Sequence, residues 1–171
     1  ARSRGEEPLF VPLPVQLADV ALWQQRELGD PDDPSSVVGN QLKYWRDQLN
    51  DLPDVLPLPT DRRRPAAASM RGAGFGFDVP AATVAAVRSA ALASGTTDFM
   101  VLHAALAVLL SRLSATSDIA IGTPNAGRGQ VELDPMVGMF VNTLVLRTHT
   151  DPAESFTDFL KRVRQVDLDA F

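Results

Sequence analysis

The spacing of apolar residues predicts two helices at the start of the chain. The first stripe begins near Gln16 and is ended by GDPDDP, residues 29–34. Its positions are Leu17, Val20, Ala21, Gln24 and Leu28. The second helix begins after Ser35 or Ser36, either of which can act as its N-cap. Its stripe consists of Val38, Leu42, Trp45 and Leu49.

The middle of the chain changes from a proline-rich stretch to apolar helices. Residues 52–69 carry too many prolines for a helix and predict an extended surface segment. GAGFGFDVP, residues 72–80, alternates phenylalanine with glycine and predicts a short strand. Pro80 then begins a helix that stops at Gly95. The next helix, roughly residues 98–113 with Thr96 or Thr97 as cap, is apolar nearly all round, so we expect it to be buried on most sides.

The last third of the chain predicts two strands and a helix. DIAIGTP, residues 118–124, reads as a short strand that breaks at Gly122 and Pro124, and a loop follows it. Residues 139–147 form the stronger strand, and a capping box of Ser155 and Asp158 starts the final helix. The predicted buried stripe of that helix is Phe156, Phe159, Leu160 and Val163. Helices alternating with a few apolar strands indicate an α/β fold in which helices cover a mixed sheet.

One strand carries polar residues within an apolar run. VGMFVNTLVLRTHT, residues 137–150, contains Asn142 and Thr143 and then Arg147. Burying an unpaired amide costs about 1 to 3 kcal/mol, so the polar pair must be hydrogen bonded or face water. We interpret the strand as the border of a wet cleft or of an irregular neighbouring segment. The sequence identifies no partner for Arg147.

Composition and charge exclude several classes of function. With 16 basic and 21 acidic side chains, the chain lacks the positive surface that nucleic-acid binding requires. It has no cysteine and two histidines, so neither a disulfide framework nor a zinc site is expected. The longest apolar run, residues 99–110, is shorter than the roughly 20 residues of a membrane span. Because no signal sequence opens the chain, we expect a cytoplasmic location.

Neither histidine has the surroundings of a catalytic base. His103 lies in the apolar helix with no carboxylate three or four residues away, and His149 lies between two threonines at a strand end. Such histidines are most often structural. Trp23 and Trp45 lie on helical stripes and are interpreted as core or interlobe contacts rather than a ligand cage.

Two arginine-containing segments are candidates for anion contacts. GTPNAGRG, residues 122–129, lacks the Gly-Lys-Ser/Thr ending of a phosphate loop. We interpret it as a turn that projects one cation, Arg128, from a strand end, with a solvated loop arginine as the alternative. DRRRP, residues 61–65, is interpreted as a solvated charged face.

Five segments together resemble the condensation domains of nonribosomal peptide synthetases. VGMFVNTLVLR resembles the family motif G-x-FVNT-x-x-x-R, and DIAIGTPNAGR resembles its IGTPVAGR strand and turn. PLPVQLADVALWQ is similar to the YxDYAVW segment, QLKYWRDQL to the YW helix, and LPLPTDRRRP to the LPTDRPRP crossing. Their order and spacing agree along essentially all 171 residues.

The resemblance implies a chloramphenicol acetyltransferase-like fold of two lobes with a substrate tunnel between them. Residues 16–171 would be part of the C-terminal lobe, and residues 1–15 the linker from an N-terminal lobe that lies outside the chain. The implied partners are that lobe, upstream and downstream carrier proteins and an adjacent adenylation domain. Both substrates would arrive on phosphopantetheine arms, and no directly bound cofactor or metal is implied. We also expect self-association, because a lobe without its partner exposes apolar surface.

Site residues follow from the same resemblance. Arg128 matches the family arginine that supports the active-site loop by pairing with its aspartate, and we expect it to be unpaired in this chain. Asn142 and Thr143 match a pair on the tunnel side.

The chain departs from the family pattern at two places. Leu17 and Val20 stand where the family has tyrosines, and the catalytic HHxxxDG motif, which lies upstream in the family, does not occur. We therefore expect this chain to be inactive alone. A heterocyclisation domain and a non-catalytic recruitment module remain alternatives, and NTLVLR argues against an epimerisation domain.

Overall fold

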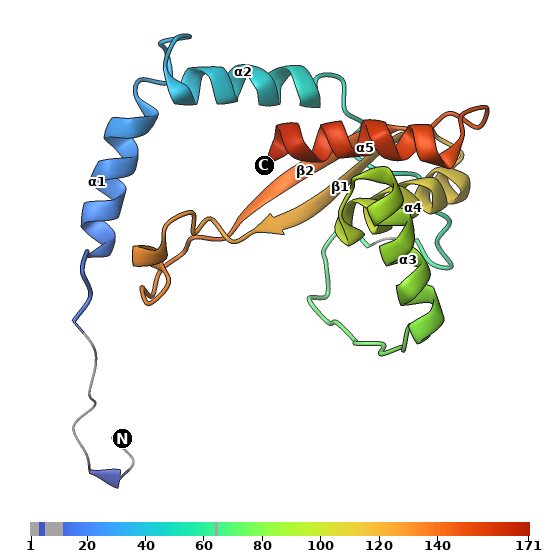
Figure 1. Ribbon diagram of the computed structural model, residues 1–171, viewed down its shortest axis with the longest axis horizontal. Coiled ribbons are helices and arrows are strands. Elements are labelled where there is room, and N and C mark those ends of the chain that lie inside the picture. Colours follow the sequence, from blue (N-terminus) through green and yellow to red (C-terminus); the bar gives the residue numbers. More distant parts are fainter. Residues whose placement is uncertain (1–3, 6–11, 64) are drawn as a thin grey trace. The chain divides into compact units, whose positions relative to one another are not determined.

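The computed structural model describes residues 4–5, 12–63 and 65–171, and the chain divides into two compact units (Figure 1). Unit 1 comprises Ala1–Asn50 and Pro124–Thr143, and unit 2 comprises Asp51–Thr123 and Leu144–Phe171. Residues 1–3 and 6–11 of the predicted linker lie outside the described residues, and so does Arg64 of the arginine run. The predicted lobe segment, residues 16–171, therefore contributes to both units.

Unit 1 holds the two predicted N-terminal helices. They are α1, Leu17–Leu28, and α2, Val37–Leu49. Ser36 is the cap of α2, where its hydroxyl accepts a hydrogen bond from the Gly39 amide at 2.9 Å. The segment after strand β1, Asp118–Asn125, adds a short 3-10 helix, η2, Val131–Leu133. The buried cluster of this unit is small and consists of Val20, Leu133 and Met136.

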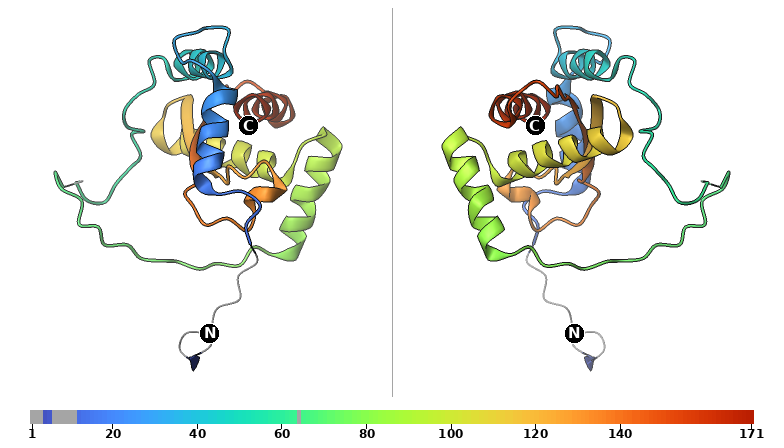
Figure 2. Two further views of the ribbon diagram at one scale, coloured as in Figure 1. Left: turned by 90° about the vertical axis from the view of Figure 1, so that its left-hand side faces the viewer. Right: turned by 90° about the vertical axis from the view of Figure 1, so that its right-hand side faces the viewer.

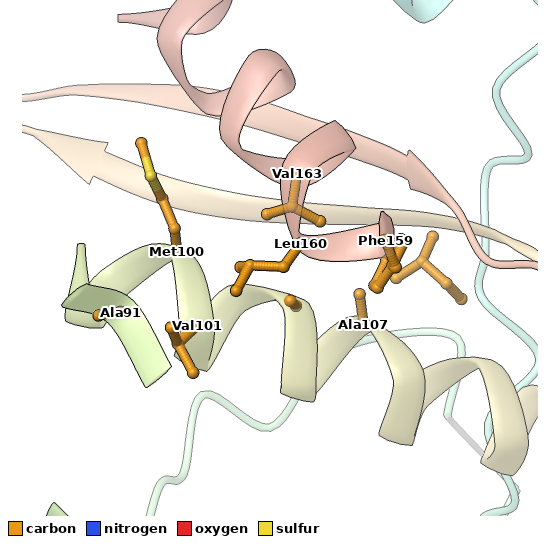
Figure 3. Close-up of a cluster of buried hydrophobic side chains, with 9 residues drawn as sticks. Ala91, Met100, Val101, Ala107, Phe159, Leu160 and Val163 are labelled. Carbon is orange, nitrogen blue, oxygen red and sulfur yellow. The ribbon is translucent and has the colours of Figure 1, made fainter. Parts of the chain in front are cut away.

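Unit 2 holds the larger hydrophobic core. Its helices are α3, Ala81–Ser94, α4, Asp98–Ser114, and α5, Phe156–Ala170. Figure 3 shows side chains of α4 and α5 facing each other, with Ala91 of α3 at the edge of the cluster. Leu160 and Val163 are almost completely buried, whereas Phe156, predicted on the same stripe, is 43% exposed. This buried cluster stabilises the packing of α5 against α4.

Local signals account for the helix boundaries in this unit. Thr97 caps α4 by accepting a hydrogen bond from Met100, and Ser155 caps α5 by accepting one from Asp158. Gly95 ends α3 in the left-handed conformation, with φ at 61°. Figure 2 shows α3 and α4 meeting at a sharp bend, which measures 104°. Within the described ranges no single helix is long and apolar enough to span a membrane, although these two helices together reach that length and composition.

The sheet consists of two antiparallel strands, β1, Asp118–Asn125, and β2, Asn142–His149. The start of β1 lies beside the end of β2, where the Thr150 amide donates to the Ser117 carbonyl at 2.8 Å. β1 continues through Gly122 and Pro124, so the predicted break at these residues is wrong. Proline is tolerated at the edge or end of a strand because its missing N–H faces no partner there. β2 begins at Asn142, three residues later than predicted.

The predicted strand at residues 72–80 is wrong for this structure. These residues form no regular secondary structure, and Figure 2 shows the chain running extended before α3. Phe75 and Phe77 are 89% and 76% exposed. An alternating pattern supplies strand propensity, but a strand needs a neighbour for its backbone hydrogen bonds. No described segment supplies one.

The expectation that α4 is buried on most sides is also wrong. Met100, Val101, Ala104 and Ala107 lie in the core. The opposite face is exposed, with Phe99, Leu102, Leu106, Leu109 and Leu113 each between 42% and 57% exposed. The helix is therefore buried on one side, although both sides are apolar.

His103 has a carboxylate partner that the sequence did not reveal. Its Nδ1 lies 2.8 Å from Oδ1 of Asp167, and both side chains are almost fully buried between α4 and α5. The residues are 64 positions apart, so no local spacing could indicate the pair. The prediction that His103 is structural is consistent with this position inside the core of unit 2.

Candidate functional site

Unit 1 brings the turn after β1 against the segment before β2. Gly127 has φ of 64°, and a Cβ atom there would overlap the backbone carbonyl oxygen of Phe140. The Gly127 amide donates to Oδ1 of Asn125 at 3.1 Å, which closes the turn. Glycine is required here by both the positive φ and the close backbone approach. The two motif segments noted in the sequence, GTPNAGR and FVNT, are therefore neighbours in space.

Arg128 links these two segments. Its guanidinium carbon lies 4.2 Å from the centre of the Phe140 ring, and its Nη1 donates to the backbone carbonyl of Leu133. The sequence predicted that Arg128 lacks its carboxylate partner in this chain, and the turn supplies a backbone carbonyl and an aromatic face to the guanidinium instead. In the described part of the chain no carboxylate forms an ion pair with it. The guanidinium, which is only part-buried, holds the turn together.

A hollow of about 520 Å³ lies beside this turn in unit 1. One wall is the face of α1 that carries Leu17, Val20, Ala21 and Gln24. The other wall is formed by Asn125, Gly127, Met139, Phe140, Val141 and Asn142. Leu17 and Val20, which stand where the family has tyrosines, therefore line the same hollow as Asn142. The lining combines apolar side chains with three side-chain amides.

Asn142 and Thr143 are both exposed, as the polar pair in an apolar strand required. Oδ1 of Asn142 accepts a hydrogen bond from the Thr143 amide at 2.8 Å, so the carbonyl of the side chain is satisfied locally. Asn142 is one of the residues that line the hollow, whereas Thr143 is not. The structure thus places only the first residue of the pair on the hollow.

A second polar cluster lies in unit 2, where Arg147 meets Asp118. Nε and Nη2 of Arg147 donate to the two carboxylate oxygens of Asp118 at 2.9 and 2.7 Å. These bonds hold the pKa of the Asp118 carboxyl below its usual value and raise that of Arg147. Sequence reasoning missed this partner. The available signal was the antiparallel pairing, which sets the start of β1 beside the end of β2.

The remaining candidates do not assemble into a second centre. His149 is 60% exposed on its side chain, with Nε2 at 3.4 Å from Asp118. Trp23 is 43% exposed, so the predicted core contact is wrong for this residue. Trp45 packs edge-on against Tyr44. The predicted interlobe contact stays a prediction. Asp61, Arg62 and Arg63 are exposed, as predicted. Across residues 4–5, 12–63 and 65–171, no three His, Asp or Glu side chains are arranged to hold a metal ion.

The sequence of this chain is similar to nonribosomal peptide synthetases over its whole length. The family model of the condensation domain matches residues 4–171. A proposed nonribosomal peptide synthetase of Salinispora arenicola is 52% identical over all 171 residues, and a dimodular nonribosomal peptide synthase of Bacillus subtilis is 47% identical. The chain spans only 2% and 7% of the length of these two relatives.

Solved structures show the same fold. The X-domain from teicoplanin biosynthesis superimposes with a TM-score of 0.86 at 32% identity, covering 99% of this chain and 38% of that one. The X-domain has also been solved in complex with OxyB, with a TM-score of 0.87, 99% of this chain covered and 37% of that chain. SgcC5 of Streptomyces globisporus matches all of this chain and 37% of its own, with a TM-score of 0.73 at 31% identity.

Proposed function

Because this chain belongs to the condensation-domain family, we propose that it is part of a synthetase domain that joins two carrier-bound thioesters through a peptide bond. The observation that carries the proposal is the joining of GTPNAGR to FVNT by the Gly127 turn and the Arg128–Phe140 stack. Family matches over residues 4–171 support it. The parent's substrates and partners are part of the proposal.

In the proposed reaction, the amine of the acceptor attacks the thioester carbon of the donor. A C–N bond forms, the C–S bond breaks, and the proton of the amine ends on the released thiol of the donor arm. The chain contains no HHxxxDG segment, so we assign the histidine that assists this step to polypeptide outside residues 1–171. Arg128 acts by supporting the turn rather than by touching the reacting atoms.

The hollow in unit 1 suits the phosphopantetheine arm on which such substrates travel. That arm joins short apolar segments through amide bonds, and the hollow is lined by apolar side chains together with Gln24, Asn125 and Asn142. We propose Asn142 and Thr143 as residues of the tunnel side. We further propose the expected partners: an N-terminal lobe, two carrier proteins and an adenylation domain, all in the cytoplasm.

The proposal is tested by comparing two polypeptides with the same loaded carriers. Residues 1–171 alone should form no peptide product, and a synthetase segment that also includes an upstream HHxxxDG should form one. Peptide formation by residues 1–171 would contradict the proposal that the catalytic histidine lies elsewhere. A product lighter by one water would instead indicate heterocyclisation.

In the longer polypeptide, replacing Arg128 should lower turnover because the turn loses its link to Phe140 and Leu133. Arg26 in α1, an exposed arginine, provides the control. We expect Arg128→Ala to lower turnover at least about tenfold and Arg26→Ala to leave it unchanged. Equal turnover in both variants would remove Arg128 from the proposed role.

A recruitment module is a second candidate, favoured by one specific observation. The X-domain, 32% identical to this chain, has been solved in complex with OxyB, another protein of the same biosynthesis. By this proposal the parent domain would bind a partner protein and catalyse no condensation. The upstream sequence separates the two candidates, because an intact HHxxxDG supports condensation and a degenerate one supports recruitment.

A further inference from the structure

Ten of the described residues line the hollow of unit 1, and none of the ten carries a charge. Their polar side chains are three amides, those of Gln24, Asn125 and Asn142. An ion brought into such a site finds no counter-charge, which costs far more free energy than bringing in a neutral polar group. The volume of about 520 Å³ lies in the range of small-molecule sites. The lining therefore selects a ligand portion that is neutral, largely apolar and able to form hydrogen bonds.

Two of these amides lie opposite each other at one end of the sheet. β1 and β2 have eight residues each, and just beyond their other end the Thr150 amide donates to the Ser117 carbonyl. Equal lengths leave no extra residue for a bulge, so counting from this contact places Asn125, the last residue of β1, across from Asn142, the first of β2. Figure 1 shows the arrowhead of β1 beside the start of β2. Directly opposed residues share one face of a sheet, with their Cβ atoms about 5 Å apart.

Each of the two asparagines is oriented by a hydrogen bond to the backbone beside it. Oδ1 of Asn125 accepts from the Gly127 amide at 3.1 Å, and Oδ1 of Asn142 accepts from the Thr143 amide at 2.8 Å. A backbone amide can only donate, so in both side chains the oxygen is the atom turned toward the chain. Neither Nδ2 forms a hydrogen bond with another described residue. The pair therefore keeps its N–H donors for a ligand.

Two neutral donors side by side match a ligand that carries two carbonyl oxygens on one flexible chain. The phosphopantetheine arm has two amide carbonyls, separated by a single β-alanine unit. Four bonds join the two carbonyl carbons, which spans about 5 Å in an extended chain. Both oxygens then point to the same side, at the spacing of opposed residues in a sheet. The phosphate of the arm, in contrast, needs a cation that the residues lining the hollow do not supply.

We propose that Asn125 and Asn142 bind the phosphopantetheine arm by donating hydrogen bonds from Nδ2 to its two amide carbonyls. The inference rests on the proposed function, and it adds Asn125 to the residues of the tunnel side. Thr143 acts through its backbone amide, which orients Asn142. Apolar residues of the hollow, among them Leu17 and Phe140, contact the methylene segments of the arm.

Substitution by aspartate tests the two donors selectively. Asn125→Asp and Asn142→Asp keep the oxygen that accepts from the backbone and replace the donating NH2 group with a second acceptor. Each should weaken binding of pantetheine to residues 1–171 at least about tenfold, measured by titration followed by NMR. Asn40→Asp, at an exposed position of α2, is the matched control for the added charge and should leave the affinity unchanged. Equal affinity in all three variants would overturn the proposal.

A change in the ligand tests the same contacts without altering the protein. An analogue of pantetheine in which trans-alkenes replace both amides keeps the length and shape of the arm but has no amide carbonyl. It should bind the unmodified chain at least about tenfold more weakly than pantetheine does. Equal binding of the two compounds, or no binding of pantetheine, would overturn the proposal.

A short peptide separates the arm from the substrate that it carries, because both contain amide carbonyls. N-acetyl-alanyl-alanine amide should bind residues 1–171 more weakly than pantetheine, since its carbonyls are one bond closer together along the chain. Tighter binding of the peptide would identify the substrate as the occupant of the hollow and would overturn the assignment to the arm.

These results are distinguishable from the test of the proposed function. If the longer polypeptide forms peptide but both aspartate variants bind pantetheine normally, the proposed function stands and the inferred contacts are wrong. If pantetheine binding depends on Asn125 and Asn142 but the longer polypeptide forms no peptide, the inferred contacts stand and the proposed condensation is wrong.

Discussion

Arg147, near the end of the apolar strand β2, can carry its charge there because Asp118 of the neighbouring strand is its partner. Its two hydrogen bonds to Asp118 are part-buried, with 12% and 18% of the two side chains exposed. A part-buried guanidinium and carboxylate joined by two parallel hydrogen bonds contribute more to the free energy of unfolding than an exposed ion pair, since water screens their interaction less. The polar end of the strand is thus a structural feature of unit 2.

Replacing Asp118 with asparagine should destabilise unit 2 in a pH-dependent way. The folded-state pKa of Asp118 lies below its ordinary value of 3.8, so the pair stabilises the fold above about pH 4 and this contribution is lost as the pH falls through the folded pKa. We expect Asp118→Asn to lower the free energy of unfolding by about 1 to 3 kcal/mol at pH 7. Below about pH 4 the difference from the unmodified chain should shrink. Urea unfolding between pH 3 and 7 measures both effects.

The control for this prediction is Asp47→Asn, which breaks the exposed Lys43–Asp47 pair of α2. Both side chains are more than 60% exposed, so the change should stay within about 0.5 kcal/mol. A loss at Asp118 no larger than this would show that the β1–β2 pair contributes little.

Gly127 and Gly129 provide a matched test of the turn in the candidate site. A Cβ atom at Gly127 would overlap the Phe140 carbonyl and would sit at positive φ, whereas nothing lies within 4 Å of a Cβ at Gly129. Gly127→Ala should therefore cost about 2 kcal/mol or more, and Gly129→Ala less than about 0.5 kcal/mol. Thermal unfolding of the two variants measures the difference. Equal stability would mean that the turn adapts to a side chain.

At the scale of the element, α4 shows how one apolar helix acquires two different faces. Its inner face packs on α5, and the buried pair of His103 and Asp167 joins the two helices. Nε2 of His103 and Oδ2 of Asp167 have no hydrogen-bond partner among the described residues. A buried pair with unsatisfied atoms adds less to stability than its short distance suggests. Removing one partner is nevertheless costly, because the other side chain then stays buried without a hydrogen-bond partner.

A double-mutant cycle across α4 and α5 tests this view of the pair. Asp167→Leu alone should cost about 3 kcal/mol or more, because it leaves a buried imidazole without its partner. Adding His103→Leu should recover part of this loss, giving a coupling of about 1 to 3 kcal/mol. Asp169→Leu, an exposed position two residues along α5, is the control and should change stability by less than about 0.5 kcal/mol. Additive single effects would show that the two side chains act independently.

Helices and strands differed in how far the sequence predicted them. The caps at Ser36, Thr97 and Ser155 were identified or narrowed to two residues, because a cap is a contact within one helical turn. The phenylalanines of residues 72–80 predicted a strand that the structure lacks, because pairing depends on a distant segment. The exposed side of α4 was missed for a related reason: apolar periodicity cannot show which of two apolar faces meets the core.

At the scale of the whole molecule, the two units should differ in local stability. Unit 2 has a core of nine buried residues across its helices and β1, whereas the buried cluster of unit 1 has three. In α2 only Gly39 is buried. Helices with few buried apolar contacts open at low free energy. Amide hydrogen exchange should therefore be slowest in α4 and α5 and fastest in α2. Comparable protection of α2 and α5 would contradict this difference.

The candidate site was predicted in outline by motifs and completed by the structure. Asn142 and Arg128 were singled out from the sequence because a polar pair and a fixed cation are unusual beside an apolar strand. The carbonyl of Leu133 and the ring of Phe140 as partners of Arg128 were not foreseen. They come from loop geometry, which no periodic pattern encodes. The proposed tunnel role of Asn142 and Thr143 stays a prediction.

By itself the sequence determined the helices, the α/β class and the condensation-domain family, because caps, periodicity and ordered motifs are properties of neighbouring residues along the chain. Only the tertiary structure decided that Asp118 faces Arg147, that Asp167 reaches His103 and that one apolar side of α4 stays exposed. These are contacts between residues far apart in sequence. Their existence depends on how whole elements pack, since a carboxylate meets its hydrogen-bond partner only when two strands or two helices have been placed side by side.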